Sequence, residues 1–132
     1  ERLGSYYKVF RTTKQDQGSA QQTCEDDGGN LASVKTSAVY NFLLGLIPDR
    51  ENYWFGLNDK DSEGTWMWAD GSRRKGCDFA NWAPYEPNDN YGRFGGQDCI
   101  HFWGGSNFRW DDDECWKGKY FICQIGPGEE NC

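Results

Sequence analysis

Basic residues are scarce in this sequence, and no long apolar segment is present. Lys and Arg number 14 against 21 Asp and Glu, for a formal net charge of −7. A chain this acidic is poorly suited to nucleic acid, because phosphates are bound mainly by Lys and Arg. No apolar run approaches the roughly 20 residues that a transmembrane helix needs. We therefore predict neither nucleic-acid binding nor insertion into a membrane.

Histidine is nearly absent, since His101 is the only one. Zn²⁺ sites are usually built from His and thiolate ligands, so this scarcity argues against zinc. His101 is followed by Phe102 and Trp103 in an apolar segment, which favours a structural role. A small secreted hydrolase with His101 as general base is an alternative, but the acidic residues cluster in a glycine-rich segment elsewhere. We predict that the protein is not an enzyme.

No signal peptide opens the chain, although six cysteines in 132 residues indicate a disulfide framework formed in an oxidising compartment. We therefore expect a secreted, extracellular protein, either mature or an excised domain, from which the targeting segment has been removed. The length fits one domain over 1–132, with a short polar tail over 126–132.

Aliphatic residues are few, whereas aromatic residues make up 17% of the chain and include seven Trp. Large rings must therefore supply much of the buried surface. On this ground we interpret Trp54, Phe55, Trp66 and Trp68 as core residues rather than as a platform for a ligand.

The first third of the chain predicts a strand, a helix and a buried link. Residues 6–10 alternate like a short strand. Ser19 is predicted to cap a helix that runs through Cys24 and ends at Gly28. Residues 31–34 then form a short apolar link.

A second helix is predicted to begin at Thr36 and to stop at Pro48. Its apolar residues recur at helical spacing, at Val39, Phe42, Leu43 and Leu46. Strands are predicted at 53–57, at 99–102, around 108–110 and at 120–124.

Roughly thirty residues from Trp68 to Gln97 show no periodicity, and a loop of this length in a small domain is usually functional. From Glu86 to Asp113 the chain is rich in carboxylate and amide oxygens, interrupted by glycines. Six to eight hard oxygen ligands suit Ca²⁺. A solvated acidic loop is the alternative interpretation. A bridge between Cys99 and Cys115, however, would bring both acidic groups together, and we therefore predict a calcium site.

Several motifs of this chain resemble those of the C-type lectin-like domain family. They are Glu86-Pro87-Asn88, the spacing from Trp110-Asp111-Asp112 to Cys115, and Tyr53-Trp54-Phe55-Gly56-Leu57. The resemblance runs from Tyr6 to Gln124 in matching order. It implies an α+β fold, in which two helices flank small antiparallel sheets, with a long calcium-binding loop and bracing disulfides. The domain core would then span about 6–124.

The resemblance also implies a cysteine pairing, which the count of six alone leaves open among 15 arrangements. Cys24 would pair with Cys123, and Cys99 with Cys115. Cys77 and Cys132 remain. Either they pair with each other, which we favour slightly, or one of them joins two chains into a homodimer.

Carried over from the family, one calcium ion would be held by Glu86, Asn88, Gln97, Asp111 and Asp112. A neighbouring second calcium would use Asp59, Glu63, Asp89 and Asp98. The first set would also bind sugar, through Glu86, Asn88, Gln97 and Asp111, with a loop ring such as Tyr91 or Phe94 against the sugar face.

Two of these positions depart from the usual family pattern, because Gln97 stands in place of Glu and Asp111 in place of Asn. The two changes cancel in charge and exchange one hydrogen-bond acceptor with one donor. Glu86 and Asn88 match mannose-type members. Taken together, however, the four positions Glu86, Asn88, Gln97 and Asp111 resemble galactose-type members. The resemblance appears when the pattern of donors and acceptors is rotated about an approximate two-fold axis.

The resemblance therefore implies a secreted calcium-dependent lectin whose partners are glycans or glycoproteins, with a galactose-type ligand slightly favoured over a mannose-type one. The alternative is a relative that binds protein or ice rather than sugar.

Overall fold

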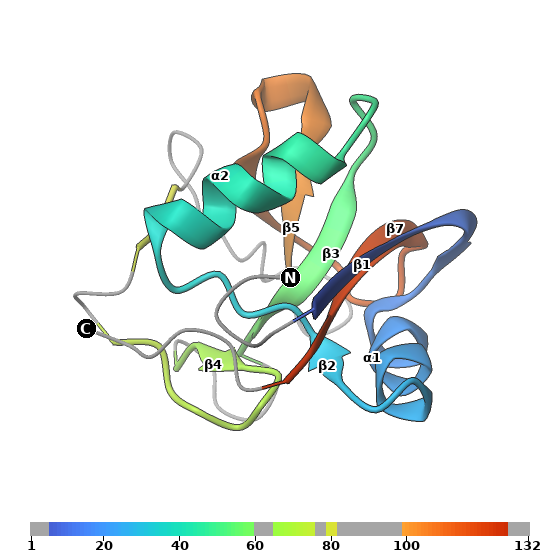
Figure 1. The fold of residues 1–132 in the computed structure, drawn as a ribbon, viewed down its shortest axis with the longest axis vertical. Helices are drawn as coiled ribbons and strands as arrows, with labels where there is room; N and C mark the ends of the chain where they lie inside the picture. The colour runs from blue at the N-terminus through green and yellow to red at the C-terminus, as the bar shows by residue number, and fades with distance from the viewer. Residues whose placement is uncertain (1–5, 60–64, 76–78, 82–98, 127–132) are drawn as a thin grey trace.

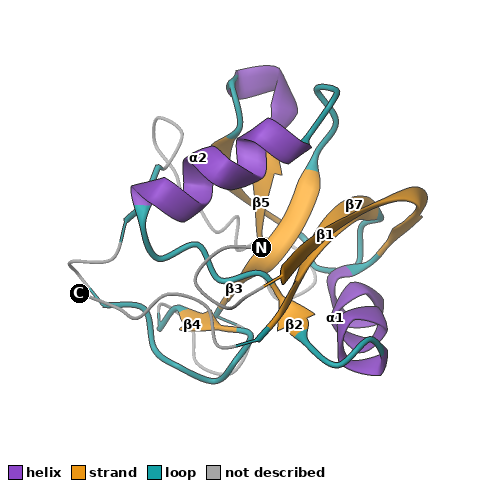
Figure 2. Ribbon diagram, in the orientation of Figure 1, coloured by secondary structure: helices purple, strands orange, loops and turns teal. Residues whose placement is uncertain are grey.

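A mixed β-sheet forms the centre of the protein, and two helices lie against it (Figures 1 and 2). The computed structural model describes residues 6–59, 65–75, 79–81 and 99–126. In chain order the elements are β1 (Tyr6–Gln15), α1 (Gln17–Asp26), β2 (Asn30–Leu31), α2 (Ser37–Leu46), β3 (Tyr53–Asn58), β4 (Met67–Trp68), β5 (Cys99–Trp103), the 3₁₀ turn η1 (Gly104–Ser106), β6 (Arg109–Asp113) and β7 (Lys119–Ile125).

The strand order is β1-β7-β3-β5-β6, with β2 beside β7 and β4 beside β3. The α+β class is therefore confirmed. Within the described residues the strands join in one sheet, whereas the sequence predicted small antiparallel ones. One pair is parallel, because the last strand β7 inserts between β1 and β3 and runs in the same direction as β3.

Each helix covers a different face of β3, because successive side chains of a strand point to opposite faces. Phe55 packs on the α2 side, in the main core, where its ring stacks on Phe102 at 4.4 Å and lies 4.9 Å from Trp110. Trp54 packs on the α1 side, with Ala20, Cys24 and Phe121. The aromatic core predicted from composition is thus present on both faces of the sheet. Trp66, which is only partly buried, lies at the edge of the main core.

The first helix begins three residues earlier than the sequence predicted. Its N-cap is Asp16, whose carboxylate accepts a hydrogen bond from the backbone N–H of Ser19 at 3.2 Å. Ser19 is therefore the capped residue rather than the cap. The helix ends at Asp26 with Asp27 as its C-cap, just before Gly28 as predicted. The φ of 91° at Gly28 favours a residue without a side chain.

The second helix is capped by Thr36, as predicted, through a bond from the Val39 N–H to its hydroxyl at 3.2 Å. Its buried residues include Tyr40, which the spacing did not select. Leu46, which the spacing did select, is 40% exposed because it is the last residue of α2. Neither α1 nor α2 has the length and apolar character needed to cross a bilayer.

Two predicted disulfides are confirmed, Cys24–Cys123 and Cys99–Cys115. The first joins α1 to β7 across 99 residues, and the second joins β5 to the turn after β6. Cys77 and Cys132 lie outside the described residues.

Candidate functional site

The candidate site is built around β6, which is the last strand in the order of the described sheet and pairs with β5. The sequence placed the acidic residues in a loop. Asp111, Asp112 and Asp113 lie instead within the strand. Trp110 before them is fully buried against Phe55 and Phe102, and this packing fixes the position of the strand.

Asp112 lies on the core face of β6, on the same side as Trp110, and is 1% exposed. The N–H of Trp110 donates to the carbonyl of Asn81 at 2.7 Å, on the side of β6 away from β5. Residues two apart in a strand direct their backbone groups to the same side. Asp112 therefore directs its carbonyl oxygen to this outer edge of β6.

Asp111 lies on the opposite face of β6, directly across from His101. One carboxylate oxygen, Oδ2, is 3.0 Å from His101 Nε2. The other ring nitrogen, Nδ1, is 3.2 Å from the carbonyl oxygen of Phe102, and the ring meets Trp54 edge-on at 5.9 Å. His101 is buried, in keeping with a structural role. The sequence did not predict the contact of His101 with Asp111, because this contact depends on the register in which β5 and β6 pair.

Asp113 has a different environment, although it shares a face of β6 with Asp111. Lys119 Nζ is 2.8 Å from its Oδ2, and Lys117 Nζ is 3.1 Å from its Oδ1. Burial alone would raise the pKa of Asp113, but the hydrogen bonds and charge of the lysines outweigh it and hold this pKa below its usual range. Asp113 thus braces the turn from β6 to β7.

Asn81 and Cys99, which lie on either side of 82–98, are both attached to β6 or to the turn that follows it. Asn81 accepts from Trp110, and its side-chain amide donates to the Tyr40 hydroxyl at 2.9 Å. Cys99 begins β5 opposite Asp113 and is bridged to Cys115. The segment that carries most of the predicted ligands therefore leaves and rejoins the described chain beside Asp111 and Asp112.

Asp59, predicted as a ligand of the second calcium, follows the end of β3 and is 1% exposed. Asn58 before it is paired with Cys99, so Asp59 lies at the same end of the sheet as the return of the long segment.

The remaining predicted site residues lie outside the described residues: Glu63, Glu86, Asn88, Asp89, Tyr91, Gln97 and Asp98. Across 6–59, 65–75, 79–81 and 99–126, no three His, Cys, Asp or Glu side chains converge as a metal site. Asp59, Asp111 and Asp112 supply carboxylate oxygens, which are the donors that Ca²⁺ prefers. The donor chemistry of the described part therefore fits calcium.

A comparison with known families shows where this arrangement belongs, because the Lectin C-type domain matches residues 13–125. The chain belongs to the C-type lectin family. It is 35% identical over 131 residues to C-type lectin domain family 10 member A of Rattus norvegicus, which covers 95% of this chain. The chain spans about two fifths, 39%, of the length of that relative.

Solved structures of C-type lectin domains, and of an antifreeze protein, share this fold. The carbohydrate-recognition domain of the mouse scavenger receptor C-type lectin has a TM-score of 0.82 at 27% identity, covering 97% of this chain and 95% of that one. The C-type lectin domain of murine dendritic cell inhibitory receptor 2, in complex with N-glycan, has a TM-score of 0.83 at 19% identity, with 96% and 94% covered. A calcium-independent type II antifreeze protein has a TM-score of 0.81 at 22% identity, with 96% and 89% covered. The last two likenesses are to the fold alone.

Proposed function

We propose that this C-type lectin domain binds glycans through a calcium ion, and that it does so outside the cell without catalysis. The observation that carries the proposal is the attachment of the long segment at Asn81 and Cys99, on either side of the strand with Asp111 and Asp112. The described disulfides support an oxidising, extracellular setting.

The principal ion would be held by the set predicted from the family pattern, Glu86, Asn88, Gln97, Asp111 and Asp112. When bound, the ion would offer coordination positions to two neighbouring sugar hydroxyls. One carboxylate oxygen of Asp111, Oδ2, is 3.0 Å from His101 Nε2, so this contact restrains the carboxylate before a ligand binds. Fixed polar groups lower the entropy that binding would otherwise lose.

A glycan array run in calcium and again in EDTA tests this proposal. The expected result is a set of glycans that the wild type binds in calcium but not in EDTA, and that Asp112→Asn does not bind in calcium. Asp27→Asn is the matched control, since Asp27 follows α1 and its carboxylate pairs with Lys8 of β1, with Oδ2 3.4 Å from Nζ. Binding to no glycan in calcium would favour the alternative of a protein or ice ligand. If every glycan bound in calcium is bound equally in EDTA, the proposal of calcium-dependent binding fails.

The sugar preferred would be of the galactose type, because Gln97 and Asp111 exchange donor and acceptor relative to the mannose-type pattern. Competition by free galactose and free mannose measures this preference. The double substitution Gln97→Glu with Asp111→Asn should move the preference towards mannose. A wild-type preference for mannose that the double substitution leaves unchanged would refute the donor–acceptor argument.

A further inference from the structure

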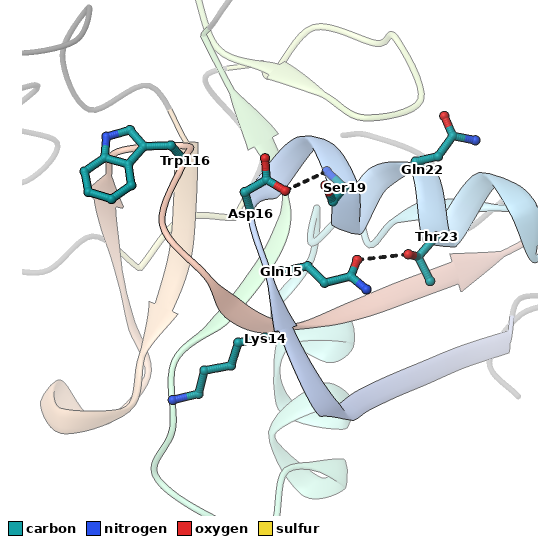
Figure 3. A pocket seen from close by; sticks show the side chains of 7 residues that line it. All are labelled: Lys14, Gln15, Asp16, Ser19, Gln22, Thr23 and Trp116. Carbon is teal, nitrogen blue, oxygen red and sulfur yellow. Dashed lines mark hydrogen bonds between the residues drawn. The ribbon is translucent and has the colours of Figure 1, made fainter.

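A hollow of about 640 Å³ lies where β1 meets α1, with Trp116 at one side. Trp116 belongs to the turn between β6 and β7 and is 57% exposed. Figure 3 shows Trp116 on one side of Asp16, and Gln22 and Thr23 of α1 on the other. The hollow is broadly open to solvent and lined mostly by polar side chains, which suits a ligand with many hydroxyl groups better than an apolar one.

The walls of this hollow are held in place by contacts from two directions. The N–H of Gln17 donates to the carbonyl of Cys115 at 2.9 Å, and Cys115 is fixed by its disulfide. The indole Nε1 of the buried Trp54 lies 3.1 Å from the Gln15 carbonyl and 3.3 Å from the Lys117 carbonyl. Trp116 thus lies between Cys115 and Lys117, both of which are held in place. The hollow is therefore preformed rather than shaped by a ligand.

Amide and carboxylate groups inside the hollow are oriented by their neighbours. The hydroxyl of Thr23 donates to Gln15 Oε1 at 2.9 Å, which leaves the Gln15 amide nitrogen as a donor. Gln22 gives its amide nitrogen to Asp26 at 2.9 Å, so its carbonyl oxygen can accept. Asp16 uses Oδ1 to cap α1 and carries a second acceptor oxygen. Donors and acceptors therefore occur side by side.

The cations around the hollow are paired with carboxylates. Lys117 Nζ lies 5.9 Å from the centre of the Trp116 ring and 3.1 Å from Asp113 Oδ1. Lys14 is paired with Glu51, with Nζ 3.3 Å from Oε1, and lies over the ring of Tyr120. Asp16 occupies the N-terminus of α1, so the backbone N–H groups there are not presented to an anion. Neither a strongly anionic nor a strongly cationic ligand is favoured. A neutral ligand with hydroxyl groups and one apolar face matches the aromatic ring and the polar wall, and a sugar ring has both.

We propose that this hollow is a second glycan-binding site, which takes a short neutral oligosaccharide. One ring of the oligosaccharide would lie against Trp116, and hydroxyls of the neighbouring rings would bind Gln15, Asp16 and Gln22. The site does not depend on calcium, because none of these residues is among the calcium ligands proposed above. The proposal therefore stands or falls separately from calcium-dependent binding at β6.

Heteronuclear NMR in EDTA tests this site directly, with maltotriose, cellotriose and triacetylchitotriose as the probes, each at concentrations on the order of 10 mM. At least one trisaccharide should shift the indole N–H resonance of Trp116. Trp116→Ala should weaken that binding by about tenfold or more, and Gln22→Ala by about threefold.

Trp103→Ala is the matched control, because Trp103 is also partly exposed, at 40%. Trp103 ends β5, whereas the Cys99–Cys115 disulfide next to Trp116 lies at the start of that strand. Its affinity for the trisaccharide should equal that of the wild type. The proposal is overturned if no trisaccharide shifts Trp116, or if both Trp116→Ala and Gln22→Ala bind as the wild type does. Amide spectra of each variant show whether it is folded, and the exposed Gln22 provides a second test should Trp116→Ala unfold.

Discussion

At the scale of single residues, three consecutive aspartates of β6 have three environments. Asp111 faces His101, Asp112 is buried on the core face, and Asp113 is neutralised by two lysines. Strand alternation separates what reads as one acidic run. This explains how a single stretch can supply two proposed calcium ligands and one carboxylate that stabilises the fold.

Asp49 is a second carboxylate whose protonation bears on stability. It accepts from the Tyr53 hydroxyl at 2.8 Å and from Arg11 at 2.7 Å. Burial would raise its pKa, but these hydrogen bonds outweigh burial and hold the pKa below the ordinary value of 3.8. A pKa lowered by folding gives stability that is present above about pH 4 and is lost as the pH falls through the folded value.

Asp49→Asn should therefore lower the free energy of unfolding at neutral pH, by at most about 1 kcal/mol because water screens this partly exposed site. Urea unfolding at pH 7 and pH 3 measures the difference between wild type and variant, which should narrow at the lower pH. Asp26→Asn, whose carboxylate is bonded to Gln22 rather than to Arg11 or Tyr53, serves as the control for removal of a carboxylate. An equal difference at both pH values would contradict the assignment.

At the scale of elements, the start of α1 distinguishes two candidate caps. Asp16→Ala removes the acceptor for the Ser19 N–H and should cost about 1 kcal/mol of stability. Ser19→Ala leaves that acceptor in place and should change stability by a few tenths at most, since Ala is the better helix former. Thermal unfolding of both variants compares them. A larger loss for Ser19→Ala would restore the cap predicted from sequence.

The elements that sequence predicted well are those specified by neighbouring residues. Thr36 caps α2 because its hydroxyl reaches a backbone N–H three residues on, and Gly28 ends α1 through its backbone conformation. Asp16 and Ser19 are both good caps, and only the length of β1, which continues to Gln15, decides between them.

The sequence by itself did not predict the contacts and disulfides that join distant segments. The contact of His101 with Asp111 depends on the register of β5 against β6, and the attachment of Asn81 to Trp110 depends on the folded sheet. The two described disulfides were predicted correctly, but only through resemblance to a family, because six cysteines do not specify their own pairing.

At the scale of the whole molecule, the two described disulfides act over very different lengths. Cys24–Cys123 closes 99 residues and ties α1 to β7, whereas Cys99–Cys115 closes 16. Chain entropy assigns about 4.7 kcal/mol to a loop near 100 residues and about 3 kcal/mol to one near 15. The long bridge should therefore matter more for global stability.

Replacing each pair by alanines tests this ordering in urea unfolding experiments. Loss of Cys24–Cys123 should lower the unfolding free energy by more than loss of Cys99–Cys115, by about 1–2 kcal/mol. The shorter bridge lies beside Asp113 and the return of the long segment, so its loss should also weaken calcium binding. Equal losses of stability, or unchanged calcium affinity without the short bridge, would contradict this division.

Calcium should stabilise the folded protein, because ligands from distant segments come together only in the native state. With the ~10⁻⁴–10⁻³ M affinity of extracellular calcium modules, about 10 mM calcium would add roughly 1–3 kcal/mol and raise Tm by several degrees. Differential scanning calorimetry in calcium and in EDTA measures the shift. Asp112→Asn should melt alike in both buffers, and a wild type that melts alike in both would count against the calcium site.

Isothermal titration of galactose into the protein, in calcium and in EDTA, tests most directly whether calcium at the β6 site binds sugar. A free monosaccharide makes few contacts, so a Kd on the order of 1 mM, about −4 kcal/mol, is expected in calcium. In EDTA, or with Asp112→Asn, the β6 site should give no heat of galactose binding. Galactose binding of equal strength in calcium and in EDTA, unchanged by Asp112→Asn, would contradict the account.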